Sequence, residues 1–237
     1  MFQAMAIMRP YISERRMRKM EEVLERRCLD VMFLYERPVN PSNVYACLRT
    51  MDAFGVQNCC ILDGGYTSTL STSGDPTGGE VRKKKNRKSK HSAMGSDKWL
   101  TVDRVNTGER GVEEVVEKLK KEGYTIYASS LEGGPKVCIV FGNEESGVSP
   151  RLKSLSEGLF YLPMSGFAES YNLSVATSLT LAYLQSKGVV GRTEGWEEER
   201  REIMCRWMIG CFPKKGMGEI ILEKEGIDVV RAGGGGK

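Results

Sequence analysis

Three short stretches of the chain carry polar residues that could act together in chemistry. They are Asn40–Val56, Phe141–Val148 and Leu162–Val175, and each couples an apolar strand-like run to a loop rich in Gly, Ser or Asn and to a helix start. Loops at strand ends leave backbone N–H and C=O groups free for a ligand, which is how α/β proteins build sites. The three stretches therefore predict one composite site at the ends of strands.

The middle stretch reads Phe-Gly-Asn-Glu-Glu-Ser-Gly-Val. Gly142 and Gly147, after an apolar strand, would let the backbone approach a flat ligand such as an adenine ring. The spacing fits neither G-x-G-x-x-G nor the P-loop pattern, so dinucleotide and triphosphate loops are poorly supported. Taken alone, the stretch favours an ordinary glycine turn after a strand.

The other two stretches place side chains near predicted helix starts. Asn43 and Arg49 lie six residues apart on one predicted helix, while Ser170 and Asn172 open another. Ser and Asn at such positions commonly cap a helix, and free N–H groups there can also bind an anion. In isolation, Asn43 is best read as an N-cap and Arg49 as a surface arginine.

Read together and in this order, the three stretches resemble the signature motifs of the SpoU/TrmH family of RNA ribose 2′-O-methyltransferases, nearly collinearly over residues 12–188. The resemblance implies an enzyme that uses S-adenosylmethionine (AdoMet). It also implies cofactor contacts, largely through the backbone, by Ser129, Gly142, Leu162 and Tyr171. The family usually has Leu where this chain has Tyr171, a larger ring that would change the local shape of the pocket.

The same resemblance assigns active-site roles to Asn43, Arg49 and Glu144, with Ser170 and Asn172 as support. In the family the arginine is proposed to take the proton of the ribose 2′-OH with help from a substrate phosphate. A free guanidinium stays protonated, so that role is demanding. An alternative role for Arg49 is to hold a phosphate and orient the 2′-oxygen toward the methyl group.

Alternating strands and helices predict an α/β fold with a parallel sheet covered on both faces. The predicted strands are Val31–Tyr35, Cys59–Leu62, Thr125–Ala128, Val137–Phe141 and Leu159–Leu162. A helix over Asn43–Phe54 should end at Gly55, and one over Ser170–Lys187 is apolar nearly all round, which predicts burial in a core or an interface. The resemblance adds a C-terminal trefoil knot and a homodimer.

The predicted organisation has three parts. Residues 1–29 form a helical extension, with an amphipathic helix over residues 13–27. Residues 30–188 form the methyltransferase domain of the SPOUT type, interrupted over 64–98 by a long Ser/Thr/Gly-rich and basic loop. Residues 189–237 form a C-terminal helix and a flexible, Gly-rich tail.

The basic charge is concentrated in one place. The net charge is +4, but residues 82–90 alone contribute seven basic side chains, so the rest of the chain is net negative; they are Arg82, Lys83, Lys84, Lys85, Arg87, Lys88 and Lys90. Such a tract predicts phosphate contact with RNA, and a plain solvated loop or an import signal is the alternative. Arg15 and Arg16 on the N-terminal helix are a second candidate RNA contact.

Composition excludes several other classes. The single histidine, His91, and an odd number of cysteines with no C-x-x-C pair argue against a metal centre or a disulfide framework. No apolar run approaches the roughly 20 residues that span a bilayer, and no signal peptide is evident. We therefore expect no metal and no membrane, and a cytoplasmic location, with an organelle or the nucleus left open.

The substrate is best predicted as a guanosine ribose of the tRNA D-loop, because the chain is most similar to the TrmH branch of the family. Three features support the similarity to this branch: the short helical extension before the first motif, the segment Gly95–Trp99 and a C-terminal helix that bears Trp207. Two alternatives stay open: ribosomal RNA as the substrate, and an RNA-binding scaffold of the same fold that has lost catalysis.

Overall fold

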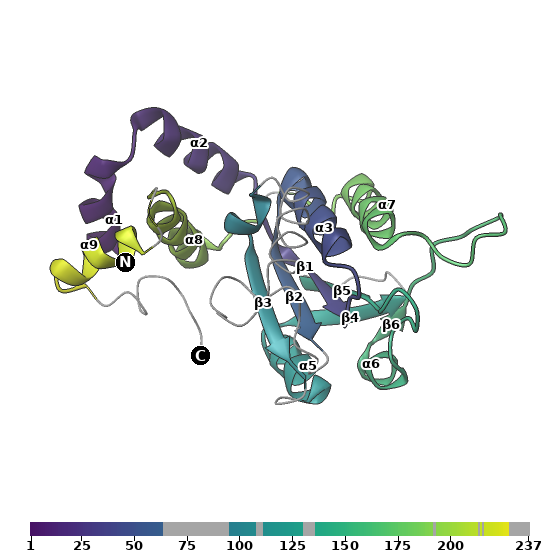
Figure 1. The fold of residues 1–237 in the computed structure, drawn as a ribbon. Helices are drawn as coiled ribbons and strands as arrows, with labels where there is room; N and C mark the ends of the chain where they lie inside the picture. The colour runs from purple at the N-terminus through teal and green to yellow at the C-terminus, as the bar shows by residue number, and fades with distance from the viewer. Residues whose placement is uncertain are drawn as a thin grey trace, which may run out of the picture. The chain divides into compact units, whose positions relative to one another are not determined.

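The computed structural model describes residues 1–63, 95–107, 111–129, 136–191, 193–212, 214 and 216–227. The basic tract 82–90, most of the predicted 64–98 loop and the Gly-rich end of the chain lie outside these residues. The chain divides into two compact units, one over Cys28–Gly191 and one that joins Met1–Arg27 to Arg192–Lys237 (Figure 1).

The larger unit contains an all-parallel sheet of six strands in the order β3-β2-β1-β5-β4-β6 (Figure 1). The strands are β1 (Cys28–Glu36), β2 (Val56–Asp63), β3 (Thr101–Asn106), β4 (Tyr124–Ser129), β5 (Lys136–Phe141) and β6 (Gly158–Leu159). This confirms the predicted α/β class. The last strand was predicted too long: it ends at Leu159, because β6 is an edge strand that pairs with β4 only.

Helices cover both faces of the sheet. Helices α3 (Pro41–Phe54) and α7 (Leu173–Ser186) pack on one face, and α5 (Val112–Lys121) and α6 (Pro150–Leu155) on the other (Figure 1). The central strand β1 supplies both cores. Phe33 and Tyr35 join the core under α3 and α7, while Met32 and Leu34 join the core under α5 and α6. Burial on both faces explains why β1 reads as a continuous apolar run.

The helix termini follow local capping rules, with two corrections to the sequence analysis. Asn40, not Asn43, caps α3, because its side chain accepts the Ser42 N–H at 2.9 Å. Helix α7 begins at Leu173 and not at the predicted Ser170. The reason is that Asn172 caps this helix, since its side-chain oxygen accepts the Ser174 N–H. Gly55 ends α3 with φ of 80°, as predicted.

Helix α7 is buried on one side within this chain, and burial of its other side in an interface stays a prediction. Thr177, Leu181 and Leu184 are buried, whereas Val175, Leu179 and Tyr183 are each more than 40% exposed. These three are spaced by four residues and so form one stripe along the helix. A stripe of this kind marks a surface that another molecule can cover.

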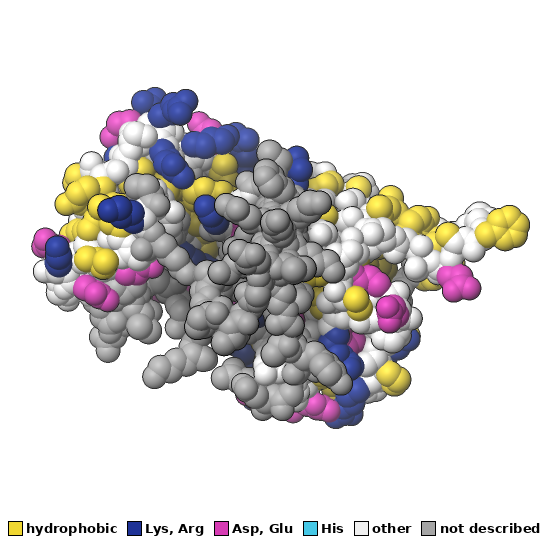
Figure 2. Space-filling model, in the orientation of Figure 1, with side chains coloured by type: hydrophobic (Ala, Val, Ile, Leu, Met, Phe, Trp, Pro, Cys, Tyr) yellow, Lys and Arg dark blue, Asp and Glu magenta, His cyan; other side chains and the backbone are white. Residues whose placement is uncertain are grey.

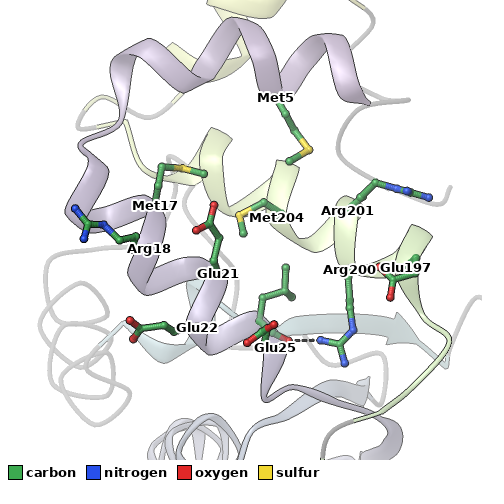
Figure 3. Close-up of a pocket in the computed structure, with 11 residues that line it drawn as sticks. Met5, Met17, Arg18, Glu21, Glu22, Glu25, Glu197, Arg200, Arg201 and Met204 are labelled. Atoms are coloured by element: carbon green, nitrogen blue, oxygen red, sulfur yellow. Dashed lines mark hydrogen bonds between the residues drawn. The ribbon is translucent and has the colours of Figure 1, made fainter.

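The smaller unit packs the helices from both ends of the chain together: α1 (Phe2–Met8), α2 (Glu14–Glu25), α8 (Glu197–Gly210) and α9 (Met217–Lys224). Arg200 of α8 ties this unit together, because its guanidinium donates to the carbonyl oxygens of Leu24, Arg27 and Thr193. It thereby satisfies carbonyls at the C-terminal end of α2. Figure 3 shows Arg200 reaching toward this end of α2.

Candidate active site

The three motifs converge on the carboxyl edge of the sheet, at the boundary between β1 and β5. From β1 the chain continues to β2 and β3 on one side, and it then returns to β4 and β5 on the other. In open α/β sheets, ligands bind at such a point, where the strand order reverses. The loops that follow β1 and β5 carry Asn40 and Glu144, and Asn43 lies in the first turn of α3.

The loop after β5 closes on itself. Asn143 and Gly147 exchange backbone hydrogen bonds of 3.0 and 2.8 Å, and the side-chain oxygen of Asn143 accepts the N–H groups of Glu145 and Ser146. A Cβ atom on Gly142 would lie 2.0 Å from the carbonyl carbon of Gly147. Glycine is therefore required at 142 by close approach within the loop itself, and this closure holds Glu144 at its tip.

Glu144 accepts hydrogen bonds from the first motif. Its carboxylate receives the backbone N–H groups of Val39 at 2.8 Å and Asn40 at 3.4 Å, and the side-chain amide of Asn43 at 3.1 Å. Partial burial alone would raise the pKa of Glu144, but the bonds from Val39 and Asn43 outweigh it and lower this pKa. Glu144 is thus an ionised acceptor, suited to positioning rather than to donating a proton.

The hydrogen-bond chain continues into the third motif. Asn43 accepts the side-chain amide of Asn172 at 3.1 Å, and Asn172 in turn accepts the N–H and hydroxyl of Ser174 at 2.9 and 2.7 Å. Because Glu144 can only accept, it orients the amide of Asn43, which then presents its oxygen to Asn172. We call this chain from Glu144 through Asn43 to Asn172 the motif relay. It joins residues from all three motifs.

Arg49 stands apart from the motif relay. Asn43 and Cys47 face α7, since they contact Asn172 and Thr177. Arg49 is two residues beyond Cys47, about 200° around the helix, so it projects from the opposite flank of α3. Its side chain is exposed, and within the described residues it forms no hydrogen bond or ion pair. The single chain therefore does not bring Arg49 together with Asn43 and Glu144.

The predicted cofactor residues lie at the same carboxyl edge. Ser129 ends β4, Gly142 follows β5, and Leu162 follows β6, and these three strands are neighbours in the sheet. Leu162 is half-buried, and Ser170 is exposed in the segment before α7. The larger ring of Tyr171 is accommodated, because its hydroxyl donates to the carbonyl oxygen of Pro163 at 3.1 Å and closes residues 163–171 into a loop.

Sequence reasoning overlooked Glu36 and Arg37, which lie directly under the loop that carries Glu144. Glu36 is 2% exposed and accepts the N–H of Ser149 at 2.7 Å, while the carbonyl oxygen of Arg37 accepts the side-chain amide of Asn143 at 2.7 Å. A charged pair at the end of an apolar strand was the available signal.

Metal and thiol chemistry find no support in the part of the chain that the structure describes. It contains no group of three or more His, Cys, Asp and Glu side chains that could hold a metal ion. Burial raises the pKa of the Cys47 thiol to about 11, so this cysteine beside α7 is not a thiolate nucleophile. No described helix has both the length and the apolar character needed to cross a membrane.

A cavity of about 590 Å³ lies in the smaller unit and not at the motif relay (Figure 3). Methionines and Leu24 form its apolar part, and glutamates and arginines line the rest. None of its residues belongs to the three motifs. Arg15 and Arg16 are exposed on α2, where Lys and Arg side chains gather in Figure 2.

Comparison with known proteins gives consistent matches. The model of the SpoU rRNA Methylase family matches residues 77–182. The tRNA (guanosine(18)-2′-O)-methyltransferases of Thermus thermophilus and Aquifex aeolicus are 30% and 29% identical, over 83% and 85% of this chain and 97% and 92% of theirs. A crystal structure titled as the A. aeolicus TrmH/SpoU tRNA modifying enzyme superposes with a TM-score of 0.64 at 27% identity, covering 85% of this chain and 98% of the other.

Proposed function

This chain belongs to the SpoU rRNA Methylase family, and we propose that it transfers a methyl group from AdoMet to the ribose 2′-OH of a guanosine in tRNA, at position 18 of the D-loop. The observation that carries the proposal is the motif relay, because it joins all three motifs through specific side-chain hydrogen bonds. The tRNA enzymes of A. aeolicus and T. thermophilus, which this chain covers almost completely, support the choice of substrate.

The carboxyl edge of the sheet suits AdoMet. Ser129, Gly142 and Leu162 follow three neighbouring strands, so their backbone groups can line one crevice, as the backbone contacts of the proposed cofactor require. Tyr171 would close the crevice through its bond to Pro163. AdoMet, when bound, supplies a methyl group on a sulfonium, an electrophile that needs no metal ion.

The protein's own residues would orient the RNA. Ionised Glu144 fixes the Asn43 amide, and Asn172 fixes its oxygen, so that these groups present a defined surface beside the crevice. Ser170 lies in the exposed segment next to Asn172 and would support the same surface. Arg49 would hold a substrate phosphate and steer the 2′-oxygen toward the methyl group.

A homodimer would reconcile the position of Arg49 with this role. Arg49 projects away from the motif relay of its own chain, and α7 exposes the stripe Val175, Leu179 and Tyr183. We infer that a second copy covers this stripe and that each active site draws residues from both chains. The predicted C-terminal trefoil knot belongs to the same proposal.

RNA affinity is proposed to come from basic side chains outside the relay. They are the 82–90 tract, which lies outside the described residues, and Arg15 and Arg16 on α2. In this proposal, residues 30–188 hold the catalytic domain and the 82–90 tract, and the N-terminal extension adds a second RNA contact through Arg15 and Arg16. A tRNA substrate would place the protein in the cytoplasm, with the nucleus and organelles as alternatives.

Ribosomal RNA is the second candidate substrate. The 23S rRNA (guanosine(2553)-2′-O)-methyltransferase of Bacillus subtilis is 27% identical over 65% of this chain, although the chain spans only 57% of that protein. A catalytically inactive RNA-binding scaffold is the third candidate, and the intact motif relay argues against it.

The decisive experiment maps methylated riboses in total tRNA and rRNA from cells with and without the protein. We expect loss of one tRNA guanosine methylation, restored by the wild-type gene but not by the Asn43→Ala variant. In vitro, purified protein should transfer labelled methyl from AdoMet to an unmodified tRNA transcript. Loss of methylation only in rRNA would favour the second candidate, and no change in either RNA would favour the inactive scaffold.

A further inference from the structure

Arg37 adopts a backbone conformation that its residue type does not favour. It is the residue directly after β1, and its φ of 47° makes it the one non-glycine residue with positive φ in the described part of the chain. Glycine reaches this left-handed region without a steric penalty, and Asn and Asp reach it more readily than arginine does. Strained backbone of this kind tends to occur at functional sites.

Two hydrogen bonds from other parts of the same chain hold the backbone of Arg37 in this conformation. Its N–H donates to the carbonyl oxygen of Leu62 at 2.8 Å, and its own carbonyl oxygen accepts the side-chain amide of Asn143 at 2.7 Å. Asn143 also organises the loop that carries Glu144. The backbone of Arg37 therefore supports the motif relay, but glycine could provide the same backbone groups with less strain.

The side chain of Arg37 needs a separate explanation. Its guanidinium nitrogen Nη2 lies 3.5 Å from Oε1 of Glu36, and the side chain remains 54% exposed. Glu36 is 2% exposed, and its other oxygen is fixed by the N–H of Ser149. A buried, anchored carboxylate thus holds one edge of the guanidinium while the rest faces solvent at the carboxyl edge of the sheet.

We propose that Arg37 binds a phosphate group of the RNA substrate beside the motif relay. A guanidinium has five N–H donors in a rigid fork that matches a phosphate, and orientation by Glu36 reduces the freedom it loses on binding. The carboxylate of AdoMet offers similar anionic oxygens, but we assign the residue to RNA because its side chain is more than half exposed. The inference rests on the proposed function, because it names a contact of the same site.

The test compares Arg37→Gly with wild type in filter binding of an unmodified tRNA transcript and in methyl transfer. Glycine keeps the backbone bonds and removes the whole side chain, including the guanidinium. We expect about tenfold weaker tRNA binding, the scale of one good charged contact, and a salt dependence flatter by somewhat under one unit of log K per log[salt]. AdoMet affinity and the midpoint of thermal unfolding should not fall. Arg37→Lys should recover only part of the affinity, because lysine cannot present the fork.

Arg151→Gln is the matched control. Arg151 is an exposed arginine on α6 that pairs with Glu113 and lies in none of the three motifs. Unchanged tRNA affinity in Arg37→Gly would overturn the proposal, and so would a loss equal to that of the control. Weakened AdoMet binding with unchanged tRNA binding would reassign Arg37 to the cofactor. If the wild type binds tRNA but transfers no methyl group, the proposed function fails while the binding comparison still decides the role of Arg37.

Discussion

At the scale of single residues, the geometry of the candidate site depends on the Glu144 carboxylate, which can only accept hydrogen bonds. The position of this carboxylate is fixed by three hydrogen bonds, because two backbone N–H groups and the Asn43 amide all donate to it. Its charge state therefore sets the orientation of every side chain that follows in the motif relay.

The first prediction concerns Glu144→Gln. The new amide would turn its N–H groups toward existing donors, which should cost about 1–3 kcal/mol in unfolding free energy and most of the methyl transfer activity. The pKa of Glu144 is lowered on folding, so its stabilisation is present above the pKa of the unfolded state and is lost as the pH falls through the lower folded value.

Denaturant unfolding at several pH values tests this prediction. Wild type should lose stability toward acid more steeply than Glu144→Gln, and the two should converge below the folded pKa of Glu144. If the unfolding free energies of the two proteins fall in parallel down to acid pH, the carboxylate does not hold the loop.

The second prediction concerns Arg49→Ala. We expect kcat to fall by about 10²-fold or more, the usual effect of losing a catalytic group. AdoMet affinity and stability should stay near wild type, because the Arg49 side chain is exposed and forms no hydrogen bond or ion pair with other described residues. Single-turnover kinetics with calorimetry of AdoMet binding measures both quantities. Normal turnover would reduce Arg49 to a surface residue.

At the scale of elements, the conformation of the loop between β5 and α6 depends on the size of the side chains within it. It closes through the Asn143–Gly147 pair, and Ser149 caps α6 through the N–H of Leu152. Its geometry leaves no room for a side chain at Gly142, whereas Gly147 has open space around it but a φ of 69°.

The third prediction uses these two glycines. Gly142→Ala should open the loop and abolish AdoMet binding, because the added carbon would overlap backbone atoms of Gly147 and Val148. Gly147→Ala should cost only about 1–2 kcal/mol, the penalty for a left-handed residue with a side chain, and should retain measurable binding. Calorimetry and thermal unfolding distinguish the two variants. Equal behaviour would mean that loop closure does not shape the cofactor site.

At the scale of the whole molecule, the exposed stripe on α7 predicts self-association. Leu179→Asp places a charge in the middle of the stripe, which should shift the protein from dimer to monomer without unfolding it, because residue 179 is already exposed within one chain. Light scattering at micromolar concentration measures the mass. Gln185→Asp, an exposed position on the same helix about 120° around it from Leu179, is the control. A wild-type mass near 26.4 kDa would contradict the dimer.

The dimer also makes a kinetic prediction. If each site needs Arg49 from the partner, Arg49→Ala and Asn43→Ala subunits mixed as heterodimers should recover part of the activity that each homodimer lacks. Activity that remains absent in the mixture would place both residues in the site of one chain, against the geometry seen here.

The sequence by itself determined the class of fold, most elements and the three motifs. Apolar strands, helix periodicity and Gly55 are local signals, because each depends on residues within a few positions of one another. The resemblance of the motifs to one family needed no coordinates either. The predicted knot, the dimer and the roles of the site residues stay predictions to be tested as described above.

Only the tertiary structure decided which polar groups meet. Glu144 binds Val39, 105 residues away, and Asn172 binds Asn43 across 129 residues, contacts that exist only once β1 and β5 are neighbours. The same arrangement set which flank of α3 faces Asn172, so that Asn43 joins the motif relay and Arg49 does not, and it holds Arg37 at a positive φ. The physical reason is that strand order and helix packing set these distances, and no local pattern in the chain records them.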